Sequence, residues 1–473
     1  MNQYQSPLDT IAAIATATGA GGVAIVRVSG PESLTTAGKV FLARSAGALA
    51  GWRANVMHYG WVKDGNGVVV DEALAVVMRA PHSYTAEDTV EIHTHGGPAV
   101  VRLTLDRCLA NGARLAEPGE FTRRAFLNGR IDLAQAEAVL DMVSARTELM
   151  LRAANQQLSG DLSRELCAMR EVLMAAYAGI EALLNFPEDD TDRGQWTQVR
   201  GELGQAQARI AALLGTARAG VILREGVRLV ICGQPNVGKS SLLNALLKQA
   251  RAIVTDVAGT TRDILEESYN LQGVPVRLVD TAGLLAPRDK VEAEAVQRSY
   301  GSIAAADIVL VVLDRSAPLT TIEGALLHGP GLDPANNSAL LSRMLVVLNK
   351  CDLPAAFTLA DAQALVPGRA VVEVSALERH GIERLETALL AMVLKGGALD
   401  TNGVMLTNVR HVQALSQAAQ ALSSAIEALD TQAPAEMVSE GIKTAVSRLD
   451  AITGRNIDQD ALDHIFASFC IGK

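Results

Sequence analysis

Residues 233–241, GQPNVGKSS, have the types and spacing of a phosphate-binding loop. The loop follows the apolar run VRLVIC, which is typical of a buried strand, and it opens the helix-like run SLLNALLKQ. In this context the glycines let backbone N–H groups approach phosphate oxygens, Lys239 reaches the β and γ phosphates, and Ser240 offers its hydroxyl to Mg²⁺. We therefore predict a nucleoside triphosphate site at Asn236, Val237, Gly238, Lys239, Ser240 and Ser241.

Asp280 is predicted to be a second phosphate-sensing group. It ends the strand-like run VRLVD and precedes Thr281-Ala282-Gly283, which would bring a carboxylate near Mg²⁺ and a backbone N–H near the γ phosphate. In many GTPases the next position is a glutamine that orients the attacking water, whereas this chain has Leu284, which cannot hold a water. Either the chain binds nucleotide without hydrolysing it, or another group positions the water.

The motif NKCD, at residues 349–352, predicts which base is bound. Asp352 can accept hydrogen bonds from the guanine N1–H and the exocyclic amine, a pattern of donors that adenine lacks. Two charge-assisted bonds of about 1.5 to 3 kcal/mol each suffice for a strong preference for GTP. Asn349 and Lys350 belong to the same loop, and Ser375 with Ala376, after the next strand-like run, would add main-chain N–H groups behind the base.

The composition is that of a globular protein with several domains. A length of 473 residues predicts roughly three domains. The net charge of −10 argues against a general nucleic-acid-coating role, because such binding rests on Lys and Arg, but it does not exclude one specific RNA. Apolar runs such as Ile308–Leu313 are too short to span a membrane. The five scattered cysteines lack a CxxC pair, which predicts neither disulfides nor a zinc site and fits a reducing cytoplasm.

Two kinds of β-containing region must hold these residues. From Thr10 to Asn128, short strand-like runs alternate with Gly and Pro around one helix-like stretch near residues 99–113, which predicts a small α+β domain. From Val227 to about Met392, strands alternate with helical segments, which predicts a doubly wound, mainly parallel sheet.

Helical spacing of apolar residues flanks the α/β region on both sides. Before it lie Leu133–Asn185 and Leu203–Ala217, and after it lie Val409–Leu429, Met437–Leu449 and Ala461–Phe469. We infer a multidomain fold in which a P-loop GTPase domain is inserted into one discontinuous helical domain. The expected boundaries are 1–128 for the N-terminal domain, 129–225 and 396–473 for the two helical parts, and 226–395 for the G domain.

With TDVAGTTRD at residues 255–263 added, the motif set resembles the TrmE-Era-EngA group of GTPases. The ends of the chain narrow the resemblance to the MnmE (TrmE) family of tRNA-modification GTPases. The stretches that carry it are ATATGAGGVAIVRVSG, HTHGGPAVV, EPGEFTRRAFLNGRIDLAQAEAV and the terminal FASFCIGK. The resemblance covers essentially the whole chain.

The resemblance implies how hydrolysis proceeds without a glutamine. In the family a potassium ion takes the place of an arginine finger, whose usual worth is about 10³ to 10⁵ in rate, and turnover starts when two G domains meet. By motif, the K⁺ ligands would be Asn236, Thr255, Val257 and Thr260, and Thr261 would join Ser240 on Mg²⁺. The rest of that loop, Asp256, Ala258 and Gly259, would line the nucleotide.

The resemblance also implies a water-positioning glutamate. By ungapped register it is Glu292, in DKVEAEAV, although the residues that follow differ from the family's usual run and Glu294 is the alternative. From the sequence alone, Glu292 would be an ordinary solvated helix residue.

A folate site is implied in the N-terminal domain, where the family binds formyl-tetrahydrofolate at a dimer interface. Motif matching puts Arg27, Glu91, Arg130 and the final Lys473 there. Glu91 could accept bonds from pterin amino groups and an arginine could pair with a carboxylate. On spacing alone, Glu91, His93 and His95 would share one strand face and could bind a metal, and Arg27 could be a surface ion-pair residue.

Cys470 has two interpretations. Its position after HIFASF is typical of a small residue packed at a helix end. The resemblance implies instead that the cysteine of the terminal CIGK is a candidate participant in catalysis.

The expected function follows from the resemblance. A homodimeric, potassium-dependent GTPase would work with the flavoprotein MnmG in a heterotetramer. Together they would add a carboxymethylaminomethyl or aminomethyl group to C5 of the tRNA wobble uridine, from a tetrahydrofolate one-carbon donor. Two alternatives stay open: a ribosome-assembly GTPase that acts as a binding switch, and a folate-dependent aminomethyl transferase with a regulatory G domain.

Overall fold

The computed structural model describes residues 9–17, 19–44, 49–185, 193–249, 267–280, 303, 305–327, 341–394 and 403–473. Contacts divide the chain into two units. Unit 1 comprises Met1–Val143, Asn155–Ala211 and Gln413–Lys473, and unit 2 comprises Ser144–Ala154 and Ala212–Val412. Unit 2 therefore interrupts unit 1 in the sequence.

The N-terminal part of unit 1 is a seven-stranded sheet in the order β3-β4-β5-β6-β2-β1-β7. Neighbouring strands are antiparallel except for the parallel pair β1 and β7. The strands are β1 (Ile11–Ile14), β2 (Gly21–Ser29), β3 (Phe41–Ala43), β4 (Met57–Lys63), β5 (Val69–Met78), β6 (Thr89–Gly96) and β7 (Arg114–Leu115), and the helices are α1 (Ser33–Val40), α2 (Pro98–Ala110) and α3 (Glu120–Leu127). The sequence predicted only the helix at α2.

Helices α1 and α2 cover one face of this sheet, and the other face is open except where Phe121 of α3 packs against it. Alternate residues of β2 and β5, such as Val26 and Ala75, are buried together with Val40 of α1 and Val101 of α2. This period of two is the pattern that a half-covered strand requires. The intervening residues of β2, β5 and β6 lie on the opposite face, which α1 and α2 leave open. They include Arg27, Glu91, His93 and the 39% exposed Leu74.

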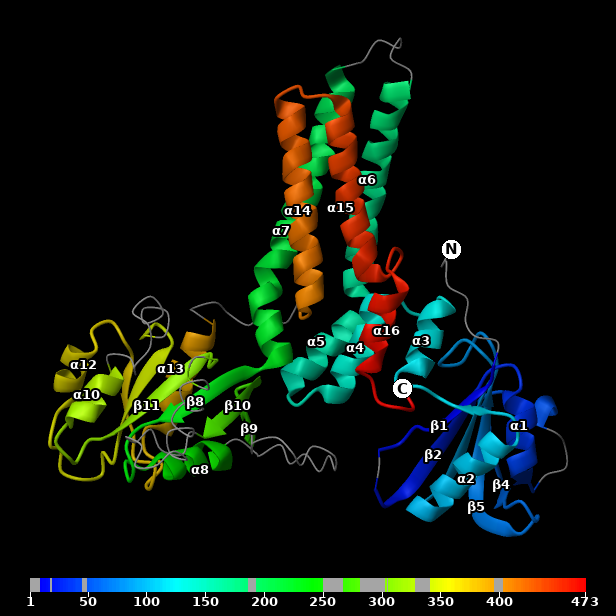
Figure 1. The fold of residues 1–473 in the computed structure, drawn as a ribbon, viewed down its shortest axis with the longest axis horizontal. Coiled ribbons are helices and arrows are strands. Elements are labelled where there is room, and N and C mark those ends of the chain that lie inside the picture. Colours follow the sequence, from blue (N-terminus) through cyan, green and yellow to red (C-terminus); the bar gives the residue numbers. More distant parts are fainter. Residues whose placement is uncertain are drawn as a thin grey trace, which may run out of the picture. The chain divides into compact units, whose positions relative to one another are not determined.

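Seven helices of the described chain lie in the two helical segments of the sequence, and some of them belong wholly or partly to unit 2 (Figure 1). They are α4 (Leu133–Ser144), α5 (Glu148–Leu158), α6 (Asp161–Asn185), α7 (Arg193–Glu225), α14 (Val409–Asp430), α15 (Ala435–Thr453) and α16 (Gln459–Ala467). Helix α7 extends beyond the predicted Leu203–Ala217 at both ends. Ion pairs join helices from the two sequence halves, as between Arg170 and Asp450 at 2.6 Å and between Arg200 and Asp430 at 2.5 Å.

Unit 2 contains a six-stranded sheet in the order β13-β12-β11-β8-β10-β9. All neighbouring pairs are parallel except β9 and β10, so the predicted doubly wound, mainly parallel sheet is confirmed. The strands are β8 (Val227–Cys232), β9 (Glu267–Leu271), β10 (Val274–Asp280), β11 (Ile308–Asp314), β12 (Met344–Asn349) and β13 (Val371–Glu373), and the helices are α8 (Lys239–Gln249), α10 (Thr321–Leu327), α12 (Leu359–Leu365) and α13 (Ile382–Leu394).

Both faces of this sheet are buried. Leu310 packs on one face with Leu246 of α8 and Leu385 of α13. Val311, its neighbour in β11, packs on the other with Leu327 of α10. This explains why β11 and β12 read as continuous apolar runs rather than alternating ones.

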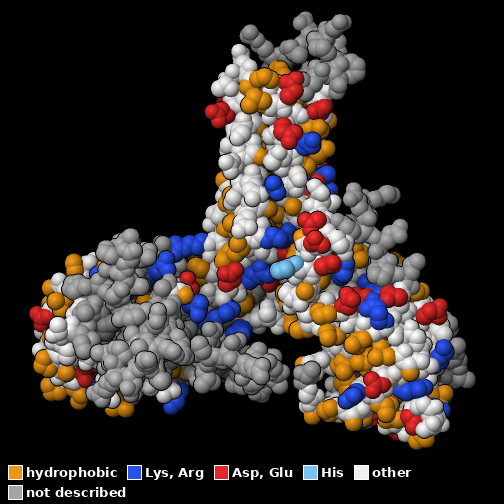
Figure 2. Space-filling view, in the orientation of Figure 1, with side chains coloured by type: hydrophobic (Ala, Val, Ile, Leu, Met, Phe, Trp, Pro, Cys, Tyr) orange, Lys and Arg blue, Asp and Glu red, His pale blue; other side chains and the backbone are white. Residues whose placement is uncertain are grey.

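Surface features complete the description. Among the described residues no helix is long and apolar enough to cross a bilayer. On the N-terminal part of unit 1, Figure 2 shows hydrophobic side chains gathered on the visible face. The exposed large hydrophobic residues of that part include Val23, Leu42, Met57, Tyr59 and Leu74.

Candidate functional site

The phosphate-binding loop connects β8 to α8 and needs both of its glycines for steric reasons. At Gly233, where φ is 151°, a Cβ would lie 2.4 Å from the Val312 carbonyl oxygen. At Gly238, where φ is 95°, a Cβ would lie 2.1 Å from Nδ2 of Asn349. Any side chain at either position would displace a neighbouring strand or loop.

Lys239 and Asn236 are the loop residues that are predicted to bind the phosphates and K⁺. The Lys239 ammonium donates to the carbonyls of Gly233 at 3.0 Å and Gln234 at 2.8 Å, so it is held over its own loop. Asn236 has a φ of 65° and an exposed side chain, and Ser240, in the first turn of α8, is also exposed. Positive charge and unpaired helix N–H groups at this point favour an anion.

Asn349 is buried between two loops. Its Nδ2 donates to the Val237 carbonyl at 2.8 Å, and its Oδ1 accepts from the Ala376 backbone N–H at 3.0 Å. The side chain therefore fixes the phosphate-binding loop relative to the predicted base-binding loop at Ser375 and Ala376. Ser375 is buried as well, and its hydroxyl accepts from the Glu378 N–H at 3.1 Å.

Lys350 is braced by Asp314, which sequence reasoning missed. Lys350 has a φ of 61°, and its ammonium lies 2.5 Å from the carboxylate of Asp314 at the end of β11. Asp314 also accepts from the hydroxyl of Ser316 at 2.6 Å. Burial alone would raise the pKa of Asp314, but the bonds from Lys350 and Ser316 outweigh it and hold the pKa below its usual value. A carboxylate directly after the apolar run of β11 was the available signal.

Asp352, the predicted guanine acceptor, is exposed. It follows β12 at the same edge as the phosphate-binding loop, because β8, β11 and β12 are parallel and their carboxyl ends coincide. This edge is where parallel α/β sheets bind ligands.

Several predicted residues lie outside the described part of the chain. They are Thr255, Asp256, Val257, Ala258, Gly259, Thr260, Thr261, Thr281, Ala282, Gly283, Leu284, Glu292 and Glu294. The backbone of Asp280 ends β10, but its side chain is not described. The described members of the predicted metal sets are therefore Ser240 for Mg²⁺ and Asn236 for K⁺.

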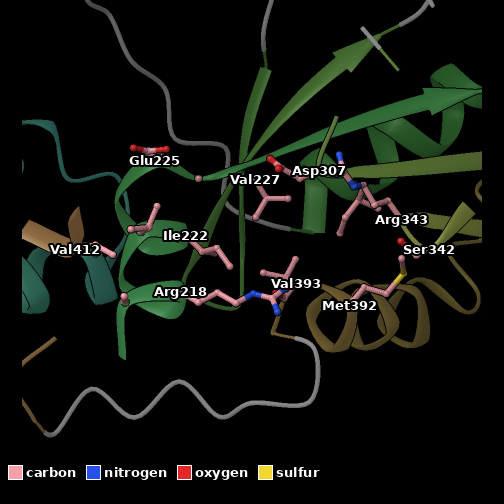
Figure 3. Close-up of a pocket in the computed structure, with 14 residues that line it drawn as sticks. Arg218, Ile222, Glu225, Val227, Asp307, Ser342, Arg343, Met392, Val393 and Val412 are labelled. Atoms are coloured by element: carbon pink, nitrogen blue, oxygen red, sulfur yellow. The ribbon is translucent and has the colours of Figure 1, made fainter. Parts of the chain in front are cut away.

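A cavity of about 770 Å³ lies at the opposite edge of the same sheet (Figure 3). It opens beside Val227 and Ile308, at the amino ends of β8 and β11, so it is separate from the nucleotide edge. Arg218 extends across it from α7, and its Nη2 donates to the Val393 carbonyl at 3.3 Å. The glycine loop and the guanine motif lie at the other edge of the sheet, where β8, β11 and β12 end.

In unit 1, Arg27 and Glu91 are direct cross-strand partners on the open face of the sheet. The Arg27 Nε lies 2.8 Å from Glu91 Oε1, and both side chains are largely buried. Burial would raise the pKa of Glu91, but the hydrogen bond from His93 and the charge and hydrogen bond of Arg27 outweigh it, so the pKa is lowered. The alternative prediction for Arg27, a surface ion pair, is therefore right about the ion pair but wrong about its exposure, because both side chains are largely buried.

The metal alternative for Glu91, His93 and His95 is not supported. His93 pairs with Glu91 at 3.4 Å, whereas the His95 ring pairs with Asp71 at 2.7 Å. Within the described ranges no three His, Cys, Asp or Glu side chains gather as metal ligands.

Tyr84 joins the two arginines of the predicted folate site. The guanidinium carbon of Arg27 is 5.2 Å from the Tyr84 ring centroid, and that of Arg130 is 5.0 Å from it. Arg130 also donates to the Tyr84 carbonyl at 2.9 Å. No sequence pattern marked Tyr84, because its position between the arginines depends on chain segments far apart in sequence.

The last residues of the chain meet the N-terminal module. The Phe121 N–H donates to the Lys473 carbonyl at 3.2 Å, and the Gly119 N–H donates to the Cys470 carbonyl at 3.3 Å. The Phe121 ring centroid lies 5.5 Å from the guanidinium carbon of Arg27, so Phe121 contacts both Lys473 and that arginine. Cys470 is exposed, so the prediction that its side chain packs in a core is wrong. Phe466 and Phe469 fill that core instead.

Comparison with known proteins gives consistent results along the chain. Residues 133–470 match the model of the MnmE helical domain, and residues 10–130 match that of the GTP-binding protein TrmE N-terminus. The tRNA modification GTPase MnmE of Alkaliphilus oremlandii is 43% identical over 466 residues, covering 98% of this chain and 99% of the relative. The protein of the same name from Chloroflexus aurantiacus is 46% identical over 470 residues, covering 98% of this chain and 100% of the relative.

Proposed function

The chain belongs to the MnmE family of tRNA modification GTPases, and from that premise we propose that it hydrolyses GTP to drive the modification of tRNA. The observation that carries the proposal is the bridge made by Asn349, which joins a phosphate-binding loop to a guanine motif in a chain similar to these GTPases along its whole length. Asn349 thereby fixes the position of the loop that would bind phosphate relative to the loop that would bind guanine.

Magnesium and potassium would share the phosphate-binding edge. Ser240 and Thr261 would hold Mg²⁺, and Asn236, Thr255, Val257 and Thr260 would hold K⁺. The exposed amide of Asn236, on a backbone turn with φ of 65°, supports this, since amide and carbonyl oxygens suit such cations. When bound, K⁺ would supply fixed positive charge beside the phosphates. Glu292, or Glu294, would then orient the water, which Leu284 cannot do.

A tetrahydrofolate one-carbon donor, formyl-tetrahydrofolate, would bind on the open face of the N-terminal sheet. Glu91, whose lowered pKa keeps it ionised, can accept from the amino groups of a pterin, and Arg27 holds it in place. Arg130 and the terminal Lys473 would complete the site, and the exposed thiol of Cys470 leaves a chemical role for it open.

The remaining assignments rest on the family. The product would be a carboxymethylaminomethyl or aminomethyl group on C5 of the wobble uridine, made with the flavoprotein MnmG. A homodimer is supported by the exposed apolar side chains of the N-terminal sheet, and the cytoplasm by five free cysteines. The functional domains would be residues 1–128, 129–225 with 396–473, and 226–395.

Mass spectrometry of wobble nucleosides tests this function against its alternatives. A deletion strain should lack the C5 group, the wild-type chain should restore it, and Lys239→Ala should not. An intact C5 group in the deletion strain would favour a ribosome-assembly GTPase. Full restoration by Lys239→Ala would favour a folate-dependent transferase whose G domain only regulates it.

A further inference from the structure

A pocket of about 310 Å³ in unit 1 brings together two arginines that meet no carboxylate among the described residues. Arg130 lines it from the turn after α3, and Arg455 lines it from the residue that follows the C-cap of α15. The Arg455 guanidinium has only the Cys167 sulfur, at 3.4 Å, as a side-chain partner in the described chain. One carboxylate, that of Asp132, also lines the pocket, but it accepts from the Gln135 N–H at 2.9 Å.

Arg130 links this pocket to the proposed folate site. Glu91 contacts Arg27, and the guanidinium groups of Arg27 and Arg130 both lie over the ring of Tyr84. Arg130 also lines the pocket that contains Arg455. The row therefore runs from a carboxylate, past an aromatic ring, to Arg130, and the pocket that Arg130 lines also contains Arg455.

A reduced folate has the complementary order of groups. Its pterin offers amino donors, its middle is an aromatic ring, and its glutamate end carries carboxylates. Folates also occur with further glutamates joined through γ-carboxyl links, and every added glutamate brings one more carboxylate. Guanidinium groups recognise carboxylates by paired hydrogen bonds.

We propose that the pocket between Arg130 and Arg455 binds the γ-linked glutamate tail, so that this site selects polyglutamylated one-carbon folates. The inference rests on the proposed folate binding and adds the substrate form. Because both arginines are exposed, the tail contributes modestly, about fivefold in affinity, and salt weakens the contribution.

The test compares two ligands on the full-length chain by calorimetry: 5-formyltetrahydrofolate with one glutamate and with three. The triglutamate should bind about fivefold more tightly. Arg455→Gln should abolish that advantage while leaving the Kd of the monoglutamate unchanged, and Arg455→Lys should retain part of it. Arg164→Gln on α6 is the matched control, because Arg164 pairs with Asp161 outside the pocket.

Each contrary result has a distinct meaning. Equal affinity for the two ligands overturns the tail site but leaves folate binding intact. A triglutamate advantage that survives Arg455→Gln overturns the assignment to this pocket. If neither ligand binds, the folate function fails and the tail site with it. If Arg455→Gln lowers only the affinity for tRNA, the pocket belongs to RNA phosphates and the proposal is wrong.

Discussion

The side-chain amide of Asn349 donates to the carbonyl of Val237 at 2.8 Å, and so ties the guanine motif to the phosphate-binding loop. The same side chain accepts from Ala376 at 3.0 Å. Three loops that follow three different strands are thus held by one buried amide, which makes nucleotide affinity depend on a residue that need not touch the nucleotide itself.

Asn349→Ala should weaken nucleotide binding at least about tenfold. The substitution leaves a buried carbonyl and a buried N–H without their partner, at a cost of about 1 to 3 kcal/mol. Titration with a fluorescent GDP analogue measures the Kd. Asn456→Ala, an exposed asparagine outside unit 2, is the control and should change nothing. Unaltered affinity in Asn349→Ala would mean that the loops keep their relative positions without the hydrogen bonds of Asn349.

Asp314→Asn should accelerate nucleotide release a few-fold, because Lys350 loses a partially sheltered ion pair of about 0.5 to 1 kcal/mol. The pKa of Asp314 is lowered from 3.8, so its contribution is complete above pH 3.8 and is lost only as pH falls through the lower folded value. Stopped-flow release rates of mutant and wild type should therefore keep a constant ratio from about pH 8 to about pH 5. A ratio that changes within that window contradicts an ionised Asp314. Asp460→Asn is an exposed control.

Asp352→Asn should shift the base preference from GTP toward XTP. The amide offers a donor where the carboxylate accepts, and xanthine carries the matching acceptor in place of the guanine amine. Competition between the two nucleotides measures the shift. Retained preference for GTP would assign the base pocket to other residues.

Replacing Na⁺ by K⁺ at equal ionic strength should raise GTP turnover at least about tenfold, because a fixed cation beside the phosphates stands in for a guanidinium. Asn236→Ala should lose this stimulation yet still bind GDP. Phosphate release reports turnover. Equal rates in the two salts would remove the potassium proposal, and a K⁺ response that survives in Asn236→Ala would move the ion elsewhere.

Arg27→Ala should reduce folate affinity at least about tenfold and leave GDP affinity as it is, since it removes the partner that holds Glu91. Calorimetry with 5-formyltetrahydrofolate measures the first and the fluorescent GDP analogue the second. Arg102→Ala on α2, whose side chain is 84% exposed, is the matched control. Folate binding that survives in Arg27→Ala would place the pterin away from the β2 and β6 pair.

Local patterns predicted much of the fold. The apolar runs of β8, β10, β11 and β12 and the order of the motifs after them indicated a parallel sheet, and the sheet has that form. Helix α1, helix α3 and the antiparallel strand β9 went unpredicted. Each of them is short, and short elements take their stability from packing rather than from their own periodicity.

The sequence by itself determined which chemical groups this protein carries and in what order, because a glycine loop or a buried strand is specified by a few consecutive residues. Only the tertiary structure decided which of these groups meet. It paired Asn349 with Val237, braced Lys350 with Asp314, and brought Cys470 to the surface above a core filled by Phe466. Such contacts join residues far apart along the chain, and their geometry is set by the packing of whole elements, which no local pattern contains.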